Sequence, residues 1–292
     1  MLSYKVDLNV IIIHVPGYDG DDKMDKKILI LDIDGTLVNS KKEITPKTFE
    51  AIMNIQDMGH IVVLASGRPY PGMKQFVEKL EMDKKGGYAI AFNGGMIVDC
   101  KTGKPVIEKC IPNKYIEPLY EYALDNEIGM VTYKDDMVIT GTKMDNYMQY
   151  EARLNFMPLK RVKDFLDFVD FDMVKCLMTA EPNVKAPRCE MELKKMFAPG
   201  LNVFRSEPYF IEITTNGVDK STTIPELLKL LDIPREKSIC CGDGFNDVTM
   251  VKCAGIGVAM ANAQQIVKDN ADYITGSCEE DGLVEVIEKF IL

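Results

Sequence analysis

Hydrophobic positions along the chain alternate between runs typical of buried strands and spacings typical of helices. Residues 28–33 form an almost uninterrupted apolar run, as expected of a strand buried on both faces. Thr45-Pro46 predicts a helix start, and the apolar residues that follow at helical spacing stop at Gly59. Predicted strands at 61–65 and 88–92, with a helix at 71–80, continue the alternation. This βαβαβ order predicts a parallel sheet with right-handed crossovers.

The stretch from residue 112 to 207 has a different order of elements. Strands and helices no longer alternate one for one, and two strands flank the short polar turn at 134–136. The predicted helices cover residues 113–127, 145–155 and 184–197, and the predicted strands cover 130–133, 137–140, 173–179 and 202–205. This order predicts an α+β domain with a mostly antiparallel sheet.

After residue 207 the regular alternation returns. Strands are predicted at 209–214, 238–241, 256–259 and 273–275, and helices at 221–231, 246–253, 263–270 and 283–291. The simplest architecture is an α/β fold with a doubly wound, mostly parallel, Rossmann-like core. Residues 26–111 and 208–292 would form this core, and residues 112–207 would be an inserted α+β domain.

The first 25 residues differ from the rest of the chain. They hold one short apolar run at 9–15 and then a polar stretch, and a strong strand follows Met24. Residues 1–25 are therefore expected to be an N-terminal extension, and an extra edge strand at 9–15 is the alternative. The apolar run is too short to span a bilayer or to form a signal peptide core, so we expect a cytoplasmic protein.

Composition narrows the classes of function and partner. The 292 residues carry a net charge of −10, which argues against non-specific binding of nucleic acid or of an anionic membrane. Eight cysteines without a CxxC pair are typical of reduced thiols in a cytosolic protein. With only two histidines and neither GxSxG nor HExxH, nothing supports a zinc site or a Ser-His-Asp triad.

Two carboxylates end the apolar strand predicted at 28–33, in the sequence Asp32-Ile33-Asp34-Gly35-Thr36. Residues two apart start toward the same side, and two like charges there cost stability unless a divalent cation offsets them. Gly35 lets the chain turn away, and the amides beyond it can hold an anion. The alternative is a strand end with ordinary helix-capping aspartates.

Two further residues, one after a strand and one before a helix, are weaker candidates for phosphate binding. Ser66 follows the strand predicted at 61–65, where its hydroxyl can donate to a phosphate oxygen; a simple helix cap is the alternative. Lys220 stands just before a predicted helix, where its ammonium can neutralise phosphate charge; a solvated surface lysine is the alternative. Neither residue specifies a site by itself.

A fourth polar segment follows the strand predicted at 238–241. It contains Asp243, Asn246 and Asp247, and glycines at 242 and 244 allow the backbone to approach a ligand closely. Carboxylate and amide oxygens suit magnesium, which prefers carboxylates together with water and substrate oxygens. An Asp-rich turn is the alternative, and the spacing does not fit an EF-hand.

The order and strand-end placement of these four segments resemble the haloacid dehalogenase-like (HAD) phosphatase superfamily, over residues 28–292. The inserted domain and the Asn93-Gly94-Gly95 turn resemble the Cof-type subfamily with a class IIB cap. Asp34 and Ser66 are only 32 positions apart, which leaves little room for the other common cap position. The resemblance thus implies a HAD-like hydrolase core at 26–111 and 208–292 and a class IIB cap at 112–207.

The same resemblance implies a magnesium-dependent phosphatase that hydrolyses small phosphorylated metabolites, such as sugar phosphates, through an aspartyl-phosphate. Asp32 would be the nucleophile, and Asp34 would protonate the leaving oxygen and then activate water. The implied magnesium ligands are Asp32, Asp243 and the backbone carbonyl of Asp34, and Asp247 would support the ion directly or through water. The residues implied for phosphate binding are Ser66, Lys220 and Asn246. Ser221 departs from the pattern, because relatives often carry glycine at that position.

Two other functions fit the same segments. A phosphomutase on this fold would return the phosphoryl group to another hydroxyl instead of water. A protein that binds a phosphorylated metabolite without turnover would be expected to lack Asp32 or Asp34, and this chain has both.

Overall fold

The computed structural model describes residues 26–292, so the expectations for residues 1–25 lie outside the described chain. The described residues divide into two compact units. The first unit contains residues 26–106 and 219–292, and the second contains residues 107–218. In the part of the chain that the structure describes, no helix is both long enough and apolar enough to cross a membrane.

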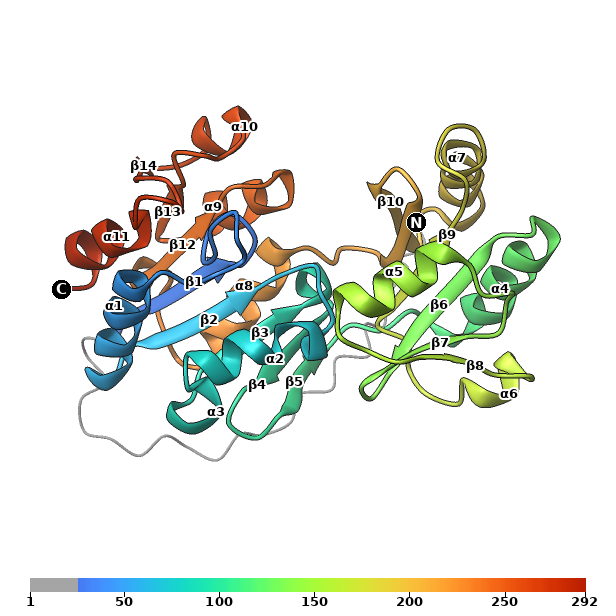
Figure 1. The fold of residues 1–292 in the computed structure, drawn as a ribbon, viewed down its shortest axis with the longest axis horizontal. Coiled ribbons are helices and arrows are strands. Elements are labelled where there is room, and N and C mark those ends of the chain that lie inside the picture. Colours follow the sequence, from blue (N-terminus) through green and yellow to red (C-terminus); the bar gives the residue numbers. More distant parts are fainter. Residues whose placement is uncertain (1–25) are drawn as a thin grey trace, which may run out of the picture. The chain divides into compact units, whose positions relative to one another are not determined.

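An eight-stranded sheet forms the centre of the first unit (Figure 1). In spatial order its strands are β14 (Tyr273–Ile274), β13 (Ile256–Ala259), β12 (Ser238–Gly242), β1 (Ile28–Asp32), β2 (Ile61–Ala65), β3 (Tyr88–Ala91), β4 (Met96–Asp99) and β5 (Lys104–Glu108). The pairs from β14 to β3 are parallel and β3 pairs antiparallel with β4. The sheet is therefore mostly parallel, and β1 lies in its interior between β12 and β2.

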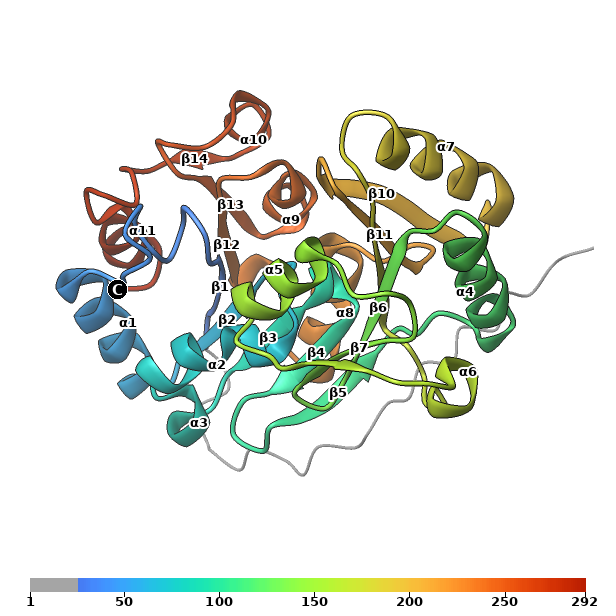
Figure 2. The same cartoon turned by 45° about the vertical axis from the view of Figure 1, so that its right-hand side comes forward.

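Helices cover both faces of this sheet (Figure 2). They are α1 (Pro46–Asp57), α2 (Tyr70–Lys79), α3 (Met82–Lys85), α8 (Lys220–Leu230), α9 (Val248–Cys253), α10 (Gln265–Lys268) and α11 (Gly282–Phe290). The predicted start of α1 is confirmed, since the Thr45 side chain accepts a hydrogen bond from the Thr48 amide and Pro46 is the first helical residue. Helix α1 packs against α11, and α8 packs against α9 on the other face. This is the doubly wound arrangement that the sequence predicts.

The second unit is built on a six-stranded sheet. Its strands, in spatial order, are β10 (Leu201–Glu207), β11 (Phe210–Thr215), β9 (Lys175–Thr179), β6 (Gly129–Lys134), β7 (Met137–Thr140) and β8 (Leu159–Arg161). Its helices are α4 (Ile116–Asp125), α5 (Asn146–Leu154), α6 (Phe165–Phe168) and α7 (Lys185–Phe197). Among the described residues of this unit only the β7–β8 pair is parallel, so the predicted mostly antiparallel α+β unit is confirmed.

One predicted strand belongs to a different sheet from the one expected. The strand expected at 209–214 was assigned to the core, yet β11 pairs with β10 and β9 in the second unit. The prediction that the core resumes at residue 208 is therefore wrong for this strand. The second unit ends at residue 218, and the first unit resumes at residue 219. The cause is a tight β10–β11 hairpin, which precedes a helix just as a core strand would.

Short elements complete the chain. The 3-10 helices are η1 (Phe92–Gly94), η2 (Asn113–Tyr115), η3 (Arg235–Lys237) and η4 (Phe245–Asp247). Strand β8 and helix α6 have no counterpart among the predicted elements, because three or four residues are too few to show a period.

Candidate active site

The backbone of β1 fixes the position of Asp32. All five residues of β1 are buried, and the strand is hydrogen-bonded on both sides, with Asp32 in register with Ala65 of β2. The chain then turns sharply at Gly35, which has a φ of +89°. This left-handed conformation disfavours a side chain, so glycine suits the turn. The carboxylate of Asp32 is thereby held at the carboxyl end of the parallel sheet.

Three predicted site residues lie together at that end. Asp32, Asp243 and Asp247 each offer a carboxylate oxygen, and these oxygens lie within 4.8 Å of one another. Asp243 directly follows β12 and Asp247 ends η4, so two neighbouring parallel strands bring the three acids together. Asp32 and Asp247 are buried, while Asp243 is half-buried. The structure therefore assembles the acidic cluster that the separate segments predict.

Lys220 lies inside this cluster. Its side chain is completely buried, and its Nζ donates to Oδ1 of Asp32 at 2.7 Å and to Oδ1 of Asp247 at 2.6 Å. Burial alone would lower the pKa of Lys220, but the charges of these two carboxylates outweigh it and raise the pKa. The lysine is therefore a fixed positive charge.

The start of α8 holds Lys220 in place. Asp219 caps the helix by accepting a hydrogen bond from the Thr222 amide, and the Thr222 hydroxyl completes a capping box. The Ser221 hydroxyl donates to the same Asp219 carboxylate at 2.5 Å. The serine that departs from the usual glycine thus adds a bond to the cap and is compatible with the turn.

The charges in the cluster do not balance. If Asp32, Asp243 and Asp247 are all ionised, Lys220 offsets only one of three negative charges. Burial, followed by the charge of Asp247, raises the pKa of Asp32 to about 8 in spite of Lys220. Burial and Asp247 also raise the pKa of Asp243 to about 6. Such a buried, oxygen-only and over-negative group fits a hard divalent cation such as Mg²⁺.

The Asp34 side chain is not part of this cluster. Arg68 binds it in a forked arrangement, with Nε 3.1 Å from Oδ2 and Nη2 3.1 Å from Oδ1, and Lys42 Nζ lies 2.7 Å from Oδ1. Partial burial would raise the pKa of Asp34, but the bonds and charges of Lys42 and Arg68 together lower it. The Asp34 carboxylate is therefore ionised in this state and is held apart from the acidic cluster.

Ser66 directly follows β2, and Asn246 lies in η4, the next element after β12. Ser66 is buried directly after β2, and its Oγ accepts a hydrogen bond from the Arg68 amide at 3.3 Å. Asn246 is exposed in η4, where its Nδ2 donates to Oδ1 of Asn93 at 3.2 Å. These hydrogen bonds connect both residues to neighbouring loops, and neither bond reaches Asp32 or Lys220.

Several groups that contact the site were not among the predicted site residues. Thr36 is buried and donates to Oδ1 of Asp243 at 3.3 Å. Arg68 and Lys42 hold Asp34, as described above. Thr36 and Arg68 stand within or beside predicted segments, so their proximity to the site was visible in the sequence. Lys42 carried no such signal, because a lone exposed lysine in a loop is usually solvated.

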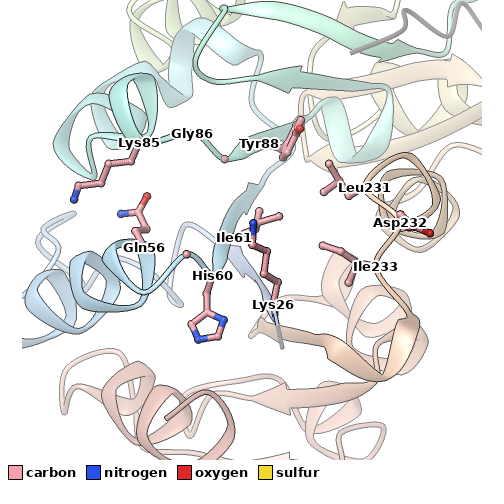
Figure 3. A pocket seen from close by; sticks show the side chains of 12 residues that line it. Lys26, Gln56, His60, Ile61, Lys85, Gly86, Tyr88, Leu231, Asp232 and Ile233 are labelled. Carbon is pink, nitrogen blue, oxygen red and sulfur yellow. The ribbon is translucent and has the colours of Figure 1, made fainter. Parts of the chain in front are cut away.

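A separate cavity of about 160 Å³ lies in the first unit (Figure 3). Ile61 and Tyr88, at the amino ends of β2 and β3, line it together with Lys26, Leu231 and Ile233. In a parallel sheet the amino and carboxyl ends of the strands form opposite edges. The cavity is therefore distinct from the acidic cluster, and no predicted site residue lines it.

Comparison with known proteins gives concordant matches. Residues 29–287 match the model of the haloacid dehalogenase-like hydrolase family. A haloacid dehalogenase-like hydrolase from Bacteroides thetaiotaomicron of known crystal structure is 41% identical; the match covers 91% of this chain and 99% of that one, with a TM-score of 0.85. The 5-amino-6-(5-phospho-D-ribitylamino)uracil phosphatase YcsE from Bacillus subtilis is 28% identical over 93% of this chain and 98% of its own length.

A third match concerns the fold alone. The solved structure of BT4131, described as a HAD subclass IIB sugar phosphatase, is 23% identical to this chain. It covers 91% of this chain and 99% of that one, with a TM-score of 0.74. The chain therefore shares its fold with that structure.

Proposed function

Because the chain belongs to the haloacid dehalogenase-like hydrolase family, we propose that it is a magnesium-dependent phosphatase acting on small phosphorylated metabolites. The predicted family and the predicted class of enzyme, a phosphoric monoester hydrolase, are confirmed by the matches. The observation that carries the finer proposal is the buried cluster of Asp32, Asp243 and Asp247 around Lys220. Three carboxylates around one buried lysine carry excess negative charge, which a bound divalent cation would offset.

Asp32 would be the nucleophile. One of its oxygens attacks phosphorus, the bond from phosphorus to the leaving oxygen breaks, and an aspartyl-phosphate forms. Lys220 would contribute its fixed charge to the phosphoryl oxygens. Ser66 and Asn246, at neighbouring loop ends, would bind the remaining oxygens. These roles rest on the positions of the four residues at the carboxyl edge of the sheet.

Asp34 would carry the proton in both halves of the reaction. It donates a proton to the leaving oxygen, and it then removes one from the water that attacks the aspartyl-phosphate and releases phosphate. In the ligand-free state Arg68 and Lys42 keep Asp34 ionised. Asp34 must therefore gain its proton after a phosphate monoester brings further negative charge beside it.

The residues that would hold magnesium are Asp32, Asp243 and Asp247, with the backbone carbonyl of Asp34. When bound, the ion would offset the repulsion between these carboxylates and the phosphate. Its charge would also favour the ionised form of Asp32 that the attack requires.

The second unit, which contains the predicted cap residues 112–207, would be a class IIB cap that excludes water from the reaction. Sugar phosphates and similar metabolites are the class we propose. We also place the protein in the cytoplasm, supported by its eight cysteines without a CxxC pair.

The test is release of phosphate from an aryl phosphate, followed by a panel of phosphorylated metabolites. Wild-type protein should release inorganic phosphate with Mg²⁺ and not with EDTA. Asp32→Asn should lower turnover by a factor of about 10³ or more, whereas Asp83→Asn, on an exposed helix of the same unit, should leave it unchanged. Normal turnover by Asp32→Asn, or isomerised sugar phosphate without free phosphate, would contradict the proposal.

A further inference from the structure

Asn262 connects three loops at the edge of the acidic cluster. It lies in the loop after β13, and its Nδ2 is 2.8 Å from the carbonyl oxygen of Gly35 and 3.4 Å from Oδ2 of Asp243. Its Oδ1 accepts a hydrogen bond from the Cys278 amide at 3.0 Å. The sequence predicts no role for Asn262, which lies outside the four polar segments that indicate the site.

The partners of Asn262 determine which way its amide faces. The Cys278 amide can only donate, so the oxygen of the Asn262 side chain must face it. The NH₂ group then faces the Gly35 carbonyl and Asp243, which are both acceptors. A flipped amide would place oxygen against oxygen at two contacts. The orientation is therefore set by the surrounding hydrogen bonds and not by the side chain alone.

Several neighbouring groups hold Asp243 in position. Thr36 donates to its Oδ1 and Asn262 lies next to its Oδ2. The lack of a side chain at Gly35 makes room for the carboxylate, since a Cβ there would lie 2.8 Å from Cγ of Asp243. The backbone of the Asn262 loop is also attached to Asp243, because the Gln264 amide donates to the Asp243 carbonyl at 2.9 Å.

The loop that supplies Cys278 is itself anchored to the first unit. Glu279 accepts a hydrogen bond from the Ser40 amide at 2.7 Å, and Asp281 accepts one from the hydroxyl of Thr45, the cap of α1. Asn262 is therefore bonded to a loop with fixed attachments, which gives its amide a defined position relative to Gly35 and Asp243.

We propose that Asn262 is a positioning residue that orients Asp243 for Mg²⁺ and fixes the turn after the nucleophile. The inference rests on the proposed function, in which Asp243 is a metal ligand. Residues that orient metal ligands through hydrogen bonds commonly change metal affinity when they are replaced. The Asn262 side chain donates to the Gly35 carbonyl and to Asp243, so it acts on the site through these two groups.

The experiment measures Mg²⁺ binding directly, by calorimetry on the full-length protein without substrate. Asn262→Ala should lower Mg²⁺ affinity about tenfold. Asn270→Ala is the matched control, because the Asn270 Nδ2 bonds only to the Ile266 carbonyl in the same region and should leave affinity unchanged. At saturating Mg²⁺, the KM of Asn262→Ala for an aryl phosphate should stay within about twofold of wild type. The melting temperature of the metal-free variant should match that of Asn270→Ala.

The outcomes separate this inference from the proposed function. If wild-type protein binds Mg²⁺ and Asn262→Ala binds it equally well, the role of Asn262 is overturned and the proposed function stands. If wild-type protein binds no Mg²⁺, both are overturned. If Asn262→Ala loses its melting transition without metal, Asn262 supports the fold in general and the positioning role is overturned.

Discussion

Oδ1 of Asp32 lies 2.7 Å from the ammonium nitrogen of Lys220, which is 188 positions further along the chain. The same ammonium lies 2.6 Å from Asp247, and the lysine has no exposed surface. This pair joins the end of β1 to the start of α8, two elements that lie far apart in the sequence. Buried charges of this kind depend on each other, and removing one member exposes the cost of the rest.

Lys220→Met should destabilise the metal-free protein by about 3–5 kcal/mol, since it leaves Asp32 and Asp247 buried without a positive partner. Mg²⁺ should restore part of this loss. Urea unfolding with and without Mg²⁺ measures both effects. Lys229→Met, at an exposed position of the same helix, is the control and should change stability by less than about 0.5 kcal/mol. If Lys220→Met and Lys229→Met lowered the stability equally, the role of Lys220 as the partner of Asp32 and Asp247 would be contradicted.

The stability of the metal-free protein should depend on pH through Asp32 and Asp243. Their pKa values rise from 3.8 to about 8 and about 6 on folding, so the folded state binds more protons than the unfolded state. Their contribution to stability is therefore complete below pH 3.8 and is lost as pH rises through 6 to 8. The rise in Tm caused by Mg²⁺ should accordingly grow over that range.

Differential scanning calorimetry in EDTA and in Mg²⁺ measures this pH dependence. Other groups also titrate, so Asp32→Asn provides the comparison and should flatten the metal-free profile toward its upper end. A Mg²⁺-induced change in Tm that is the same at about pH 5 and about pH 8.5 would argue against the raised pKa values.

Gly35→Ala should abolish Mg²⁺ binding and destabilise the protein. An alanine there adopts a φ of +89° and its Cβ collides with the Asp243 carboxylate. Gly59→Ala separates the strain of the backbone conformation from the collision with Asp243, because Gly59 has a φ of +87° with nothing within 4 Å of the added Cβ. Gly59→Ala should cost only about 1 kcal/mol from the backbone and retain Mg²⁺ binding. Calorimetric titration and thermal unfolding of both variants measure the difference.

Arg68→Ala should lower kcat about 10–100-fold, because Asp34 loses the forked partner that fixes its position. KM should change less, since the residues proposed to bind phosphate are untouched. Arg68→Lys retains the charge but not the planar fork, so its kcat should lie between those of wild type and Arg68→Ala. Steady-state kinetics with an aryl phosphate at saturating Mg²⁺ give these values, and an unchanged kcat for Arg68→Ala would refute the role.

The part of the site that is predictable from the sequence is the part set by strand ends. A buried parallel strand shows as a continuous apolar run, so the residues after it can be assigned to one edge of the sheet. Asp32, Ser66 and Asp243 are located in this way: Asp32 is the last residue of β1, and Ser66 and Asp243 directly follow β2 and β12. Lys220 is located only by the helix start that follows it.

Contacts between loops and the pairing of short hairpins were not predictable. The forked bond between Arg68 and Asp34 depends on side-chain directions that no periodic pattern records. The same holds for Asn262, an exposed asparagine in a loop. Strand β11 was assigned to the wrong sheet because strand pairing depends on the partner available, and an apolar strand before a helix suits either sheet.

The position of β1 between two parallel neighbours also limits how this protein can change during evolution. Each residue of β1 from Ile28 to Leu31 is paired with a residue of both β2 and β12. Deletion or insertion of one residue within β1 would exchange the two faces of the strand and turn Asp32 away from Lys220. Variation in length is therefore expected in the loops, where it leaves the Asp32 carboxylate in place beside Lys220.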